Sequence, residues 1–329
     1  MIFELLNNIG ALIARLLFGI IQAAVLIMIA LITQILESRT FKSCIELSRP
    51  FNSIMAAVFV AVVVLMSGET SPTLMIAASS VVVTLTAAGN VINDYYDKDI
   101  DAINKPNRPI PSKRIQEEIA LLFGIMLFAI GILMAGTLNQ IAFVIAVINS
   151  VLLVSYAKRL KKVGFIGNLV VSYLAGSTFL FAGAVVNTFY SWSIGAVLFV
   201  SAFFVTGGRE IAKAMEDLKG DKEAGAKTLP VMMGMQKSAQ IAMSFLVLVV
   251  LLSPAPYLIG LFGAGYIPVI LIGDALFLYS GRMLMKNPDK ETAAKVQKLL
   301  KLGMLIALAA FIAGAGKLHE MVAALIQSR

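Results

Sequence analysis

Residues 73–101 read "TLMIAASSVVVTLTAAGNVINDYYDKDID" and join a long apolar run to a cluster of carboxylates. Residues 73–93 are long enough to cross a membrane, because a helix needs roughly 20 residues to span about 30 Å of hydrocarbon. The run is followed directly by Asp94, Asp97, Asp99 and Asp101. Carboxylates near hydrocarbon are costly unless a cation meets them. The stretch therefore predicts a membrane helix whose end binds a positively charged partner.

The composition places the whole chain in a membrane. Hydrophobic residues make up 59% of the chain and charged residues only 14%, whereas a soluble domain has roughly 25% charged residues. Runs that are long enough to span lie near residues 52–67, 73–93, 118–136, 139–155, 165–184, 191–208, 239–255, 264–281 and 302–316. The sequence therefore predicts an all-α, polytopic membrane protein with nine transmembrane helices.

The first forty residues form a separate apolar extension. Residues 16–36, "LLFGIIQAAVLIMIALITQIL", are long enough to span a membrane, yet they include Gln22 and Gln34. A cleaved signal peptide is not expected, because the segment has neither a basic n-region nor a clear small-residue cleavage site. We expect an extra helix within residues 1–40, either spanning the membrane or lying at its interface, and a transmembrane domain over residues 41–329.

The basic residues alternate between loops and so indicate the topology. Between Arg49 and Lys301, Lys and Arg occur at Arg49 itself and in residues 94–117, 156–164, 209–238 and 282–301, whereas the intervening loops contain none. By the positive-inside rule the basic loops face the cytoplasm. We therefore expect a multi-pass protein of the cell membrane. The net charge of +8 reflects this topology, with some attraction to membrane lipids, and not binding of nucleic acid.

The residue types that are scarce restrict the kind of metal site. The chain has one cysteine, Cys44, and one histidine, His319, which excludes an intrachain disulfide and a histidine-rich metal site. Any metal must be held by oxygen, which favours Mg²⁺ or a similarly hard cation.

Two segments carry acids at helical spacing. Asn90, Asp94, Asp97 and Asp101 share one narrow face, at 100° per residue, if the helix continues through them. A second stripe occurs in "GGREIAKAMEDLKGDKEAGAKTLP", residues 207–230, where Asp217 and Asp221 follow the face of Glu210 if the helix continues past Gly220. The repetition suggests two related halves that supply metal-binding oxygens to one central cavity.

Cations surround both acidic stripes. They are Arg108, Lys113, Arg114, Lys158, Arg159, Lys161, Lys162, Arg209 and Lys213. Carboxylates that bind Mg²⁺, together with Arg and Lys that stabilise charge on a leaving group, are typical of diphosphate chemistry. Beside an apolar cavity, the expected diphosphate ester is an isoprenoid one.

The two motifs resemble those of a known family. "NDYYDKDID", residues 93–101, is similar to the NDxxDxxxD motif of the UbiA-type intramembrane prenyltransferase superfamily, and "EDLKGD", residues 216–221, is similar to its second aspartate motif. The resemblance covers about residues 42–316. "INKPNRPIPS" after the first motif and "GAKTLP" after the second are most like the archaeal branch, which makes digeranylgeranylglyceryl phosphate.

The resemblance implies nine helices around a central cavity and Mg²⁺-dependent ionisation of an allylic diphosphate. It implies metal binding by Asn90, Asp94, Asp97 and Asp101 and by Asp217 and Asp221, the aspartates being catalytic. Tyr156 and Lys161 resemble a catalytic Tyr/Lys element, and the expected substrate-binding residues are Asn90, Asn93, Arg49, Arg108, Lys158, Arg209 and Lys213. Two features depart from the family pattern: Ala214 stands where relatives often have an acid, and residues 1–40 are additional.

Each assignment has a structural alternative. Interfacial acids are often simply solvated, the basic residues after Tyr156 also serve as topology determinants, and Arg209 and Lys213 can pair with acids of their own helix. Asp274 is an intramembrane acid and hence a functional candidate. Alternatively, it is protonated or hydrogen-bonded to a neighbouring helix.

The expected reaction is transfer of a geranylgeranyl group from its diphosphate to geranylgeranylglyceryl phosphate, which forms the second ether bond of archaeal lipids. The expected cofactor is Mg²⁺, and the partners are an isoprenoid diphosphate and a lipid-phosphate acceptor. An aromatic acceptor, as in quinone or haem pathways, is the alternative. A transporter is disfavoured, because transporters place their coupling site near the bilayer midplane, whereas most polar residues here gather at the cytoplasmic end.

Overall fold

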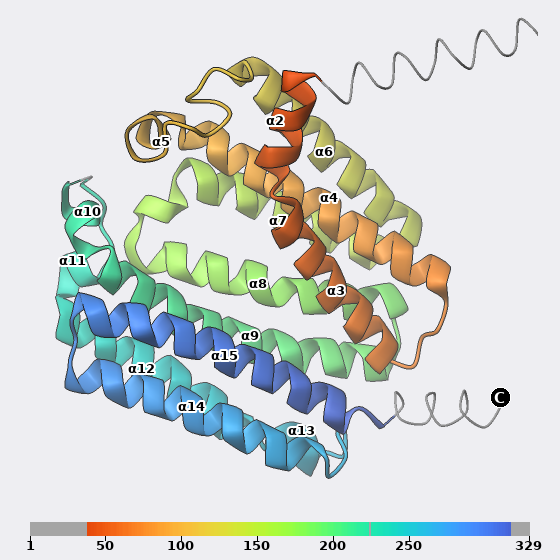
Figure 1. Ribbon diagram of the computed structural model, residues 1–329. Coiled ribbons are helices and arrows are strands. Elements are labelled where there is room, and N and C mark those ends of the chain that lie inside the picture. The colour runs from red at the N-terminus through yellow and green to blue at the C-terminus, as the bar shows by residue number, and fades with distance from the viewer. Residues whose placement is uncertain (1–37, 224, 317–329) are drawn as a thin grey trace, which may run out of the picture.

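The computed structural model describes residues 38–223 and 225–316, and every regular element in these ranges is a helix (Figure 1). The first half contains α2 (Arg39–Ser48), α3 (Pro50–Met66), α4 (Pro72–Tyr96), α5 (Lys98–Asn104), α6 (Glu117–Leu138) and α7 (Gln140–Lys158). The 3-10 turn η1 (Leu160–Lys162) leads into α8 (Gly164–Val186). The second half contains α9 (Phe189–Glu216), α10 (Leu218–Glu223), α11 (Leu229–Met233), α12 (Met235–Leu252), α13 (Ala255–Leu258), α14 (Tyr266–Lys286) and α15 (Lys290–Gly314). The helix expected within residues 16–36 lies outside the described residues.

The predicted all-α, multi-span fold is confirmed in these ranges, with eight candidate spans or up to nine. Eight helices are long and apolar enough to cross a membrane, and α2 and α3, bent by 45° relative to each other, together form the ninth candidate. Several helices extend well beyond the predicted runs, because hydropathy identifies only the part that lies in hydrocarbon. Thus α9 continues to Glu216 and α15 begins at Lys290, each with a charged end.

The helices form two packed groups (Figure 1). In one group α4 packs against α3, α6 and α7, and in the other α9 packs against α12 and α15, with α14 between these two. Helix α8 contacts α3, α7 and α9 and so joins the groups. Small residues allow close approach between membrane helices, and Gly195 on α9 lies against the backbone of α8 at Phe179 and Gly183.

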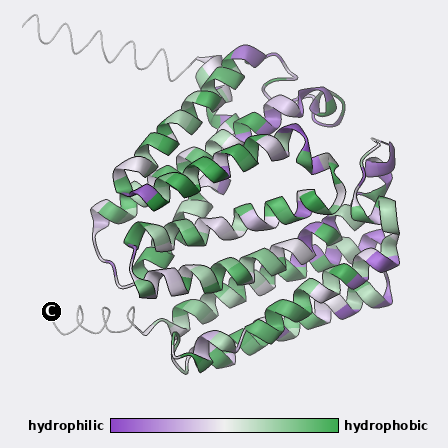
Figure 2. Ribbon diagram, turned by 180° about the vertical axis from the view of Figure 1, so that it is seen from behind, coloured by the Kyte–Doolittle hydropathy of each residue, from purple (hydrophilic) through white to green (hydrophobic). Residues whose placement is uncertain are grey.

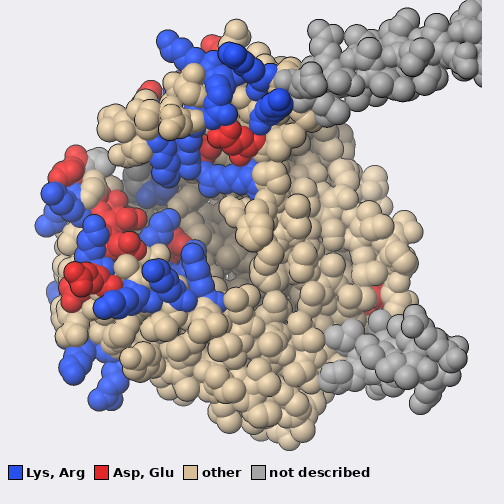
Figure 3. Space-filling view, in the orientation of Figure 1, with Lys and Arg blue, Asp and Glu red and all other residues tan. Residues whose placement is uncertain are grey.

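The polar residues gather at one end of the bundle. Figure 2 shows largely apolar helix bodies, with most of the hydrophilic segments at one end. Because consecutive spans run in opposite directions, the loops with α5, η1, α10 and α11 all meet at this end. Figure 3 shows Lys, Arg, Asp and Glu on the visible face gathered around a hollow there. The basic loops, which alternate along the sequence, thus lie together at one end of the folded bundle.

Candidate active site

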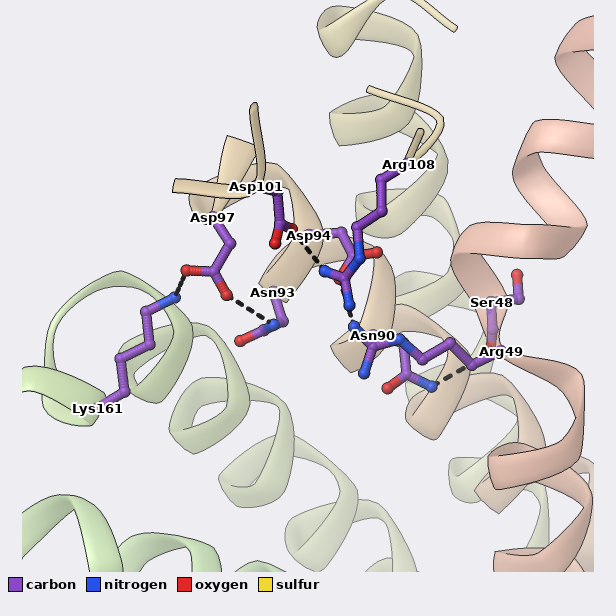
Figure 4. Close-up of polar contacts among 9 residues, drawn as sticks. All are labelled: Ser48, Arg49, Asn90, Asn93, Asp94, Asp97, Asp101, Arg108 and Lys161. Atoms are coloured by element: carbon purple, nitrogen blue, oxygen red, sulfur yellow. Dashed lines mark hydrogen bonds and ion pairs between the residues drawn. The ribbon is translucent and has the colours of Figure 1, made fainter. Parts of the chain in front are cut away.

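The first acidic motif contains a break in the helix. Helix α4 ends at Tyr96, Asp97 has φ −93° and ψ 0°, and α5 starts at Lys98. The condition for Asn90, Asp94, Asp97 and Asp101 to share one face, an unbroken helix, is therefore not met, although backbone hydrogen bonds from Asp97 to Asn93 and from Asp101 to Asp97 cross the break. In Figure 4, Asp94 and Asp101 point towards Arg108, whereas Asp97 points towards Lys161.

Arg108 joins two buried carboxylates. Its Nη1 lies 3.0 Å from Oδ1 of Asp94 and 2.5 Å from Oδ2 of Asp101, and each aspartate is only 5% exposed. Arg49 reaches the same Oδ1 of Asp94 at 2.6 Å. Two guanidiniums thus offset the cost of burying two carboxylates, as a low-dielectric site requires.

Arg49 is placed by the bend between α2 and α3. It has φ 46° and ψ 68°, a left-handed conformation that is uncommon outside glycine. Pro50, the first residue of α3, disfavours the right-handed helical region for the residue before it. The bend turns the guanidinium towards Asp94, although the two residues are 45 positions apart.

Asp97 is held by a different set of groups. Its Oδ1 pairs with Nζ of Lys161, and its Oδ2 accepts a hydrogen bond of 2.9 Å from the side-chain amide of Asn93. Lys161 lies in η1, so this pair connects the α7–α8 loop to the end of α4. Asn90 instead donates to the carbonyl of Ser48 at 3.2 Å, next to the α2–α3 bend.

The second acidic motif has a similar backbone but different partners. Helix α9 ends at Glu216, Asp217 has φ −86° and ψ 2°, and α10 follows, so this stripe is also broken. Among the described residues the Asp217 carboxylate has no hydrogen-bond partner, whereas Asp221 accepts a hydrogen bond of 3.0 Å from the hydroxyl of Thr228. Desolvation by the surrounding protein raises the pKa of Asp217 above its ordinary value, although nearby Lys213 opposes the shift.

Not every expected site residue meets the acids. Arg209 pairs with Glu210 at 2.5 Å, and Lys213 lies 3.9 Å from the same carboxylate. Both are thus in ion pairs on their own helix, as the structural alternative proposed. Lys158 is exposed, with no ion pair in the described part of the chain.

The donor set suits a hard cation, although the acids are not gathered into a cage. Within residues 38–223 and 225–316, no three acidic, histidine or cysteine side chains are grouped closely enough to hold a metal ion. Figure 4 shows the carboxylates of the first motif paired with Arg108 and Lys161. All candidate donors are oxygens, which fits Mg²⁺. A cation would have to replace these ion pairs, while Asp217 is available without such an exchange.

Two cavities lead away from this end of the bundle. The α4 cavity, about 330 Å³, is lined by Asn90, Asn93 and Tyr156 among mostly apolar residues of α4, α7 and α8. The α9 cavity, about 380 Å³, lies between α3, α8, α9, α12, α14 and α15. Both are lined in part by Ala56 and Thr178, so they adjoin. Their volumes are in the range of small-molecule sites, roughly 300–1,000 Å³.

Sequence reasoning missed several residues of this region. Ala56, Thr178 and Asn149 line the cavities, and no motif marks them. The polar Thr178 and Asn149 within apolar spans were a usable signal, because polar residues inside membrane helices are costly.

Acidic motifs and cations at the end of two membrane-embedded cavities define an intramembrane prenyltransferase. The chain belongs to the UbiA prenyltransferase family, whose profile matches residues 54–315. It is 43% identical over 277 residues to a digeranylgeranylglyceryl phosphate synthase of Methanothermobacter thermautotrophicus, covering 84% of this chain and 97% of that relative.

Solved structures agree with this assignment. A structure described as that of digeranylgeranylglyceryl phosphate synthase has a TM-score of 0.77 and 42% identity, covering 84% of this chain and 98% of its own. A UbiA homologue from Archaeoglobus fulgidus bound to DMAPP and Mg²⁺ has a TM-score of 0.58 at 19% identity, covering 82% and 99%. The second likeness shows the fold.

Proposed function

We propose that the protein transfers a geranylgeranyl group from its diphosphate to geranylgeranylglyceryl phosphate and so forms the second ether bond of archaeal membrane lipids. The observation that carries this proposal is the 43% identity to a synthase of that name over nearly its full length. The two adjoining cavities are consistent with a reaction that brings together two lipid chains.

We place the donor's diphosphate between the two acidic motifs. In this proposal Asp94, Asp97 and Asp101 hold Mg²⁺ on one side, and Asp217 and Asp221 hold it on the other, with Asn90 at the edge of the first set. The bound ion would neutralise charge on the leaving diphosphate. Arg108 and Lys161, released from their carboxylates, would contact oxygens of the donor's diphosphate, because guanidinium and ammonium groups form strong charge-assisted bonds to them.

The apolar cavity walls protect the reacting carbon. The bond between C1 of the donor and its oxygen breaks, and the electron pair leaves with the diphosphate. The acceptor hydroxyl oxygen then bonds to C1 and loses its proton. Walls that exclude water keep the allylic cation from being hydrolysed, and Tyr156, which lines the α4 cavity, presents a ring that can stabilise positive charge.

A reconstitution experiment tests the proposal. Purified protein in lipid nanodiscs receives labelled geranylgeranyl diphosphate with Mg²⁺ and either geranylgeranylglyceryl phosphate or 4-hydroxybenzoate. We expect label in the glycerol lipid alone, and none when a chelator replaces Mg²⁺. Transfer to the aromatic acceptor alone would replace the proposed function with the quinone- or haem-type reaction.

A further inference from the structure

A small polar cluster lies within the second group of helices, away from both acidic motifs. Asp274 on α14 is 6% exposed, and its Oδ2 accepts a hydrogen bond of 2.5 Å from Oγ of Ser253. The hydroxyl of Tyr266 donates to the backbone carbonyl of Ser253 at 2.8 Å. Oδ1 of Asp274 has no hydrogen-bond partner among the described residues. A carboxyl group kept in a membrane with an unpaired oxygen is costly, which points to a function.

This cluster lies at the far end of the α9 cavity. Ser253 follows the last residue of α12 and Tyr266 is the first residue of α14, so both lie at the end opposite the charged loops. Phe311 stacks on Tyr266, with ring centroids 5.7 Å apart, and all of these residues line the cavity. The polar end of the cavity is marked by Asn52 and Thr206.

The α9 cavity therefore runs from the cations towards this cluster. Asn52 and Thr206 are each three residues from a cation of the site, Arg49 and Arg209. Asp274 precedes Lys286, at the charged end of α14, by twelve residues, which corresponds to about 18 Å of helix. This depth is more than half of the roughly 30 Å hydrocarbon layer.

We propose that Asp274, positioned by Ser253, ends the binding site of the donor's isoprenoid chain and so determines the chain length that the enzyme accepts. This inference rests on the proposed function, since it assumes that the donor is an isoprenoid diphosphate. An isoprenoid tip has no hydrogen-bonding group. Oδ1 of Asp274 is already covered by protein, so a chain that is too long for the cavity could advance only by displacing the carboxyl group from Ser253. The chain offers no replacement for this buried hydrogen bond, and its loss opposes binding.

Donor chain length is the measurement that tests the inference. Values of kcat/KM are measured for farnesyl, geranylgeranyl and geranylfarnesyl diphosphate with one fixed acceptor. Asp274→Ala should raise the ratio of geranylfarnesyl to geranylgeranyl transfer by about tenfold, the scale of a pocket contact. Asp274→Leu, which fills the end of the cavity, should shift the preference towards farnesyl, and Asp274→Asn should keep the wild-type preference.

Ser280→Ala is the matched control. Ser280 is also buried on α14, with a hydroxyl that lacks a partner in the described part of the chain, but it is not among the residues that line the α9 cavity. It should leave chain preference unchanged. If Asp274→Ala does not fold, the inference is tested by the chain preferences of the other two variants: a shift towards farnesyl in Asp274→Leu and no shift in Asp274→Asn.

The outcomes separate the inference from the proposed function. Folded Asp274→Ala and Asp274→Leu proteins that lose activity equally with all donors would show a structural role and overturn the inference. A change of preference only when the acceptor chain is varied would also overturn it. Failure of the wild-type protein to transfer any isoprenoid chain would instead overturn the proposed function, and the inference with it.

Discussion

Asp97 and Asp217 have the same backbone conformation at the same point of two different helices. Each directly follows a membrane-spanning helix, with φ and ψ of −93° and 0° for Asp97 and −86° and 2° for Asp217. In each case the aspartate carbonyl accepts a hydrogen bond from the N–H of a second aspartate, at 2.8 Å from Asp101 and 3.0 Å from Asp221. The two motifs thus share a local backbone geometry, and they differ in that Asp97 pairs with Lys161.

Neutralising either repeated aspartate should abolish turnover. Asp97→Asn and Asp217→Asn remove one charge from the proposed metal-binding sets, and we expect kcat/KM to fall on the order of a thousandfold. Asp99→Asn is the control, because Asp99 is exposed and belongs to neither set. Kinetics with saturating Mg²⁺ and thermal melting in detergent measure the effects. Near-normal rates in both variants would contradict the two-motif site.

Arg108 should be important for stability as well as for catalysis. Arg108→Gln leaves Asp101 without its cation, and breaking a buried pair of this kind costs roughly 3 kcal/mol or more. Arg114→Gln breaks an ion pair with Glu46 in which both side chains are largely exposed, 39% and 47%, and should cost about 1 kcal/mol or less. Denaturant or thermal unfolding of the two variants side by side makes the comparison. Equal losses would argue against a special role for Arg108.

Arg49 should affect the acceptor more than the donor. An acceptor that is itself a phosphate needs cations beyond those used by the diphosphate, and Arg49 lies at the α2–α3 bend, apart from the second motif. We expect Arg49→Gln to raise KM for geranylgeranylglyceryl phosphate several-fold and to leave KM for the donor unchanged. Varying each substrate separately tests this, with Arg159→Gln as the control. An equal rise in both KM values would refute the assignment.

The orientation can be tested with single cysteines in a Cys44→Ser background. Cysteines at Asn107 or Lys222 should react with an impermeant thiol reagent only from the cytoplasmic side, whereas cysteines at Thr70 or Asn187 should react only from outside. The expectation follows from the basic loops. Labelling with the opposite pattern would reverse the proposed topology and the side from which the diphosphate enters.

Hydropathy and charge predicted the spans well, because each span is a local property of about 20 residues. The helix ends before Asp97 and Asp217 could not be located from the spacing of the acids, which predicts a shared face only if each helix continues. The Arg49–Asp94 contact was also beyond prediction, since it depends on a bend that brings together residues 45 positions apart. For Asp274, the structure contains one of the two alternatives: its carboxyl group accepts a hydrogen bond from Ser253, at the end of the neighbouring helix α12.

In the proposed function, the pairing of Arg108 and Lys161 with the aspartates makes substrate binding an exchange of counterions. A carboxylate can accept Mg²⁺ at low cost only if its guanidinium or ammonium partner moves to a new anion, and the proposed anion is the diphosphate. The diphosphate therefore binds the cationic side chains that Mg²⁺ displaces from the aspartates, and Mg²⁺ binds the carboxylates that those side chains leave. Mg²⁺ and diphosphate should bind weakly when offered singly and more tightly together, and by thermodynamic linkage each should raise the affinity of the other by the same factor.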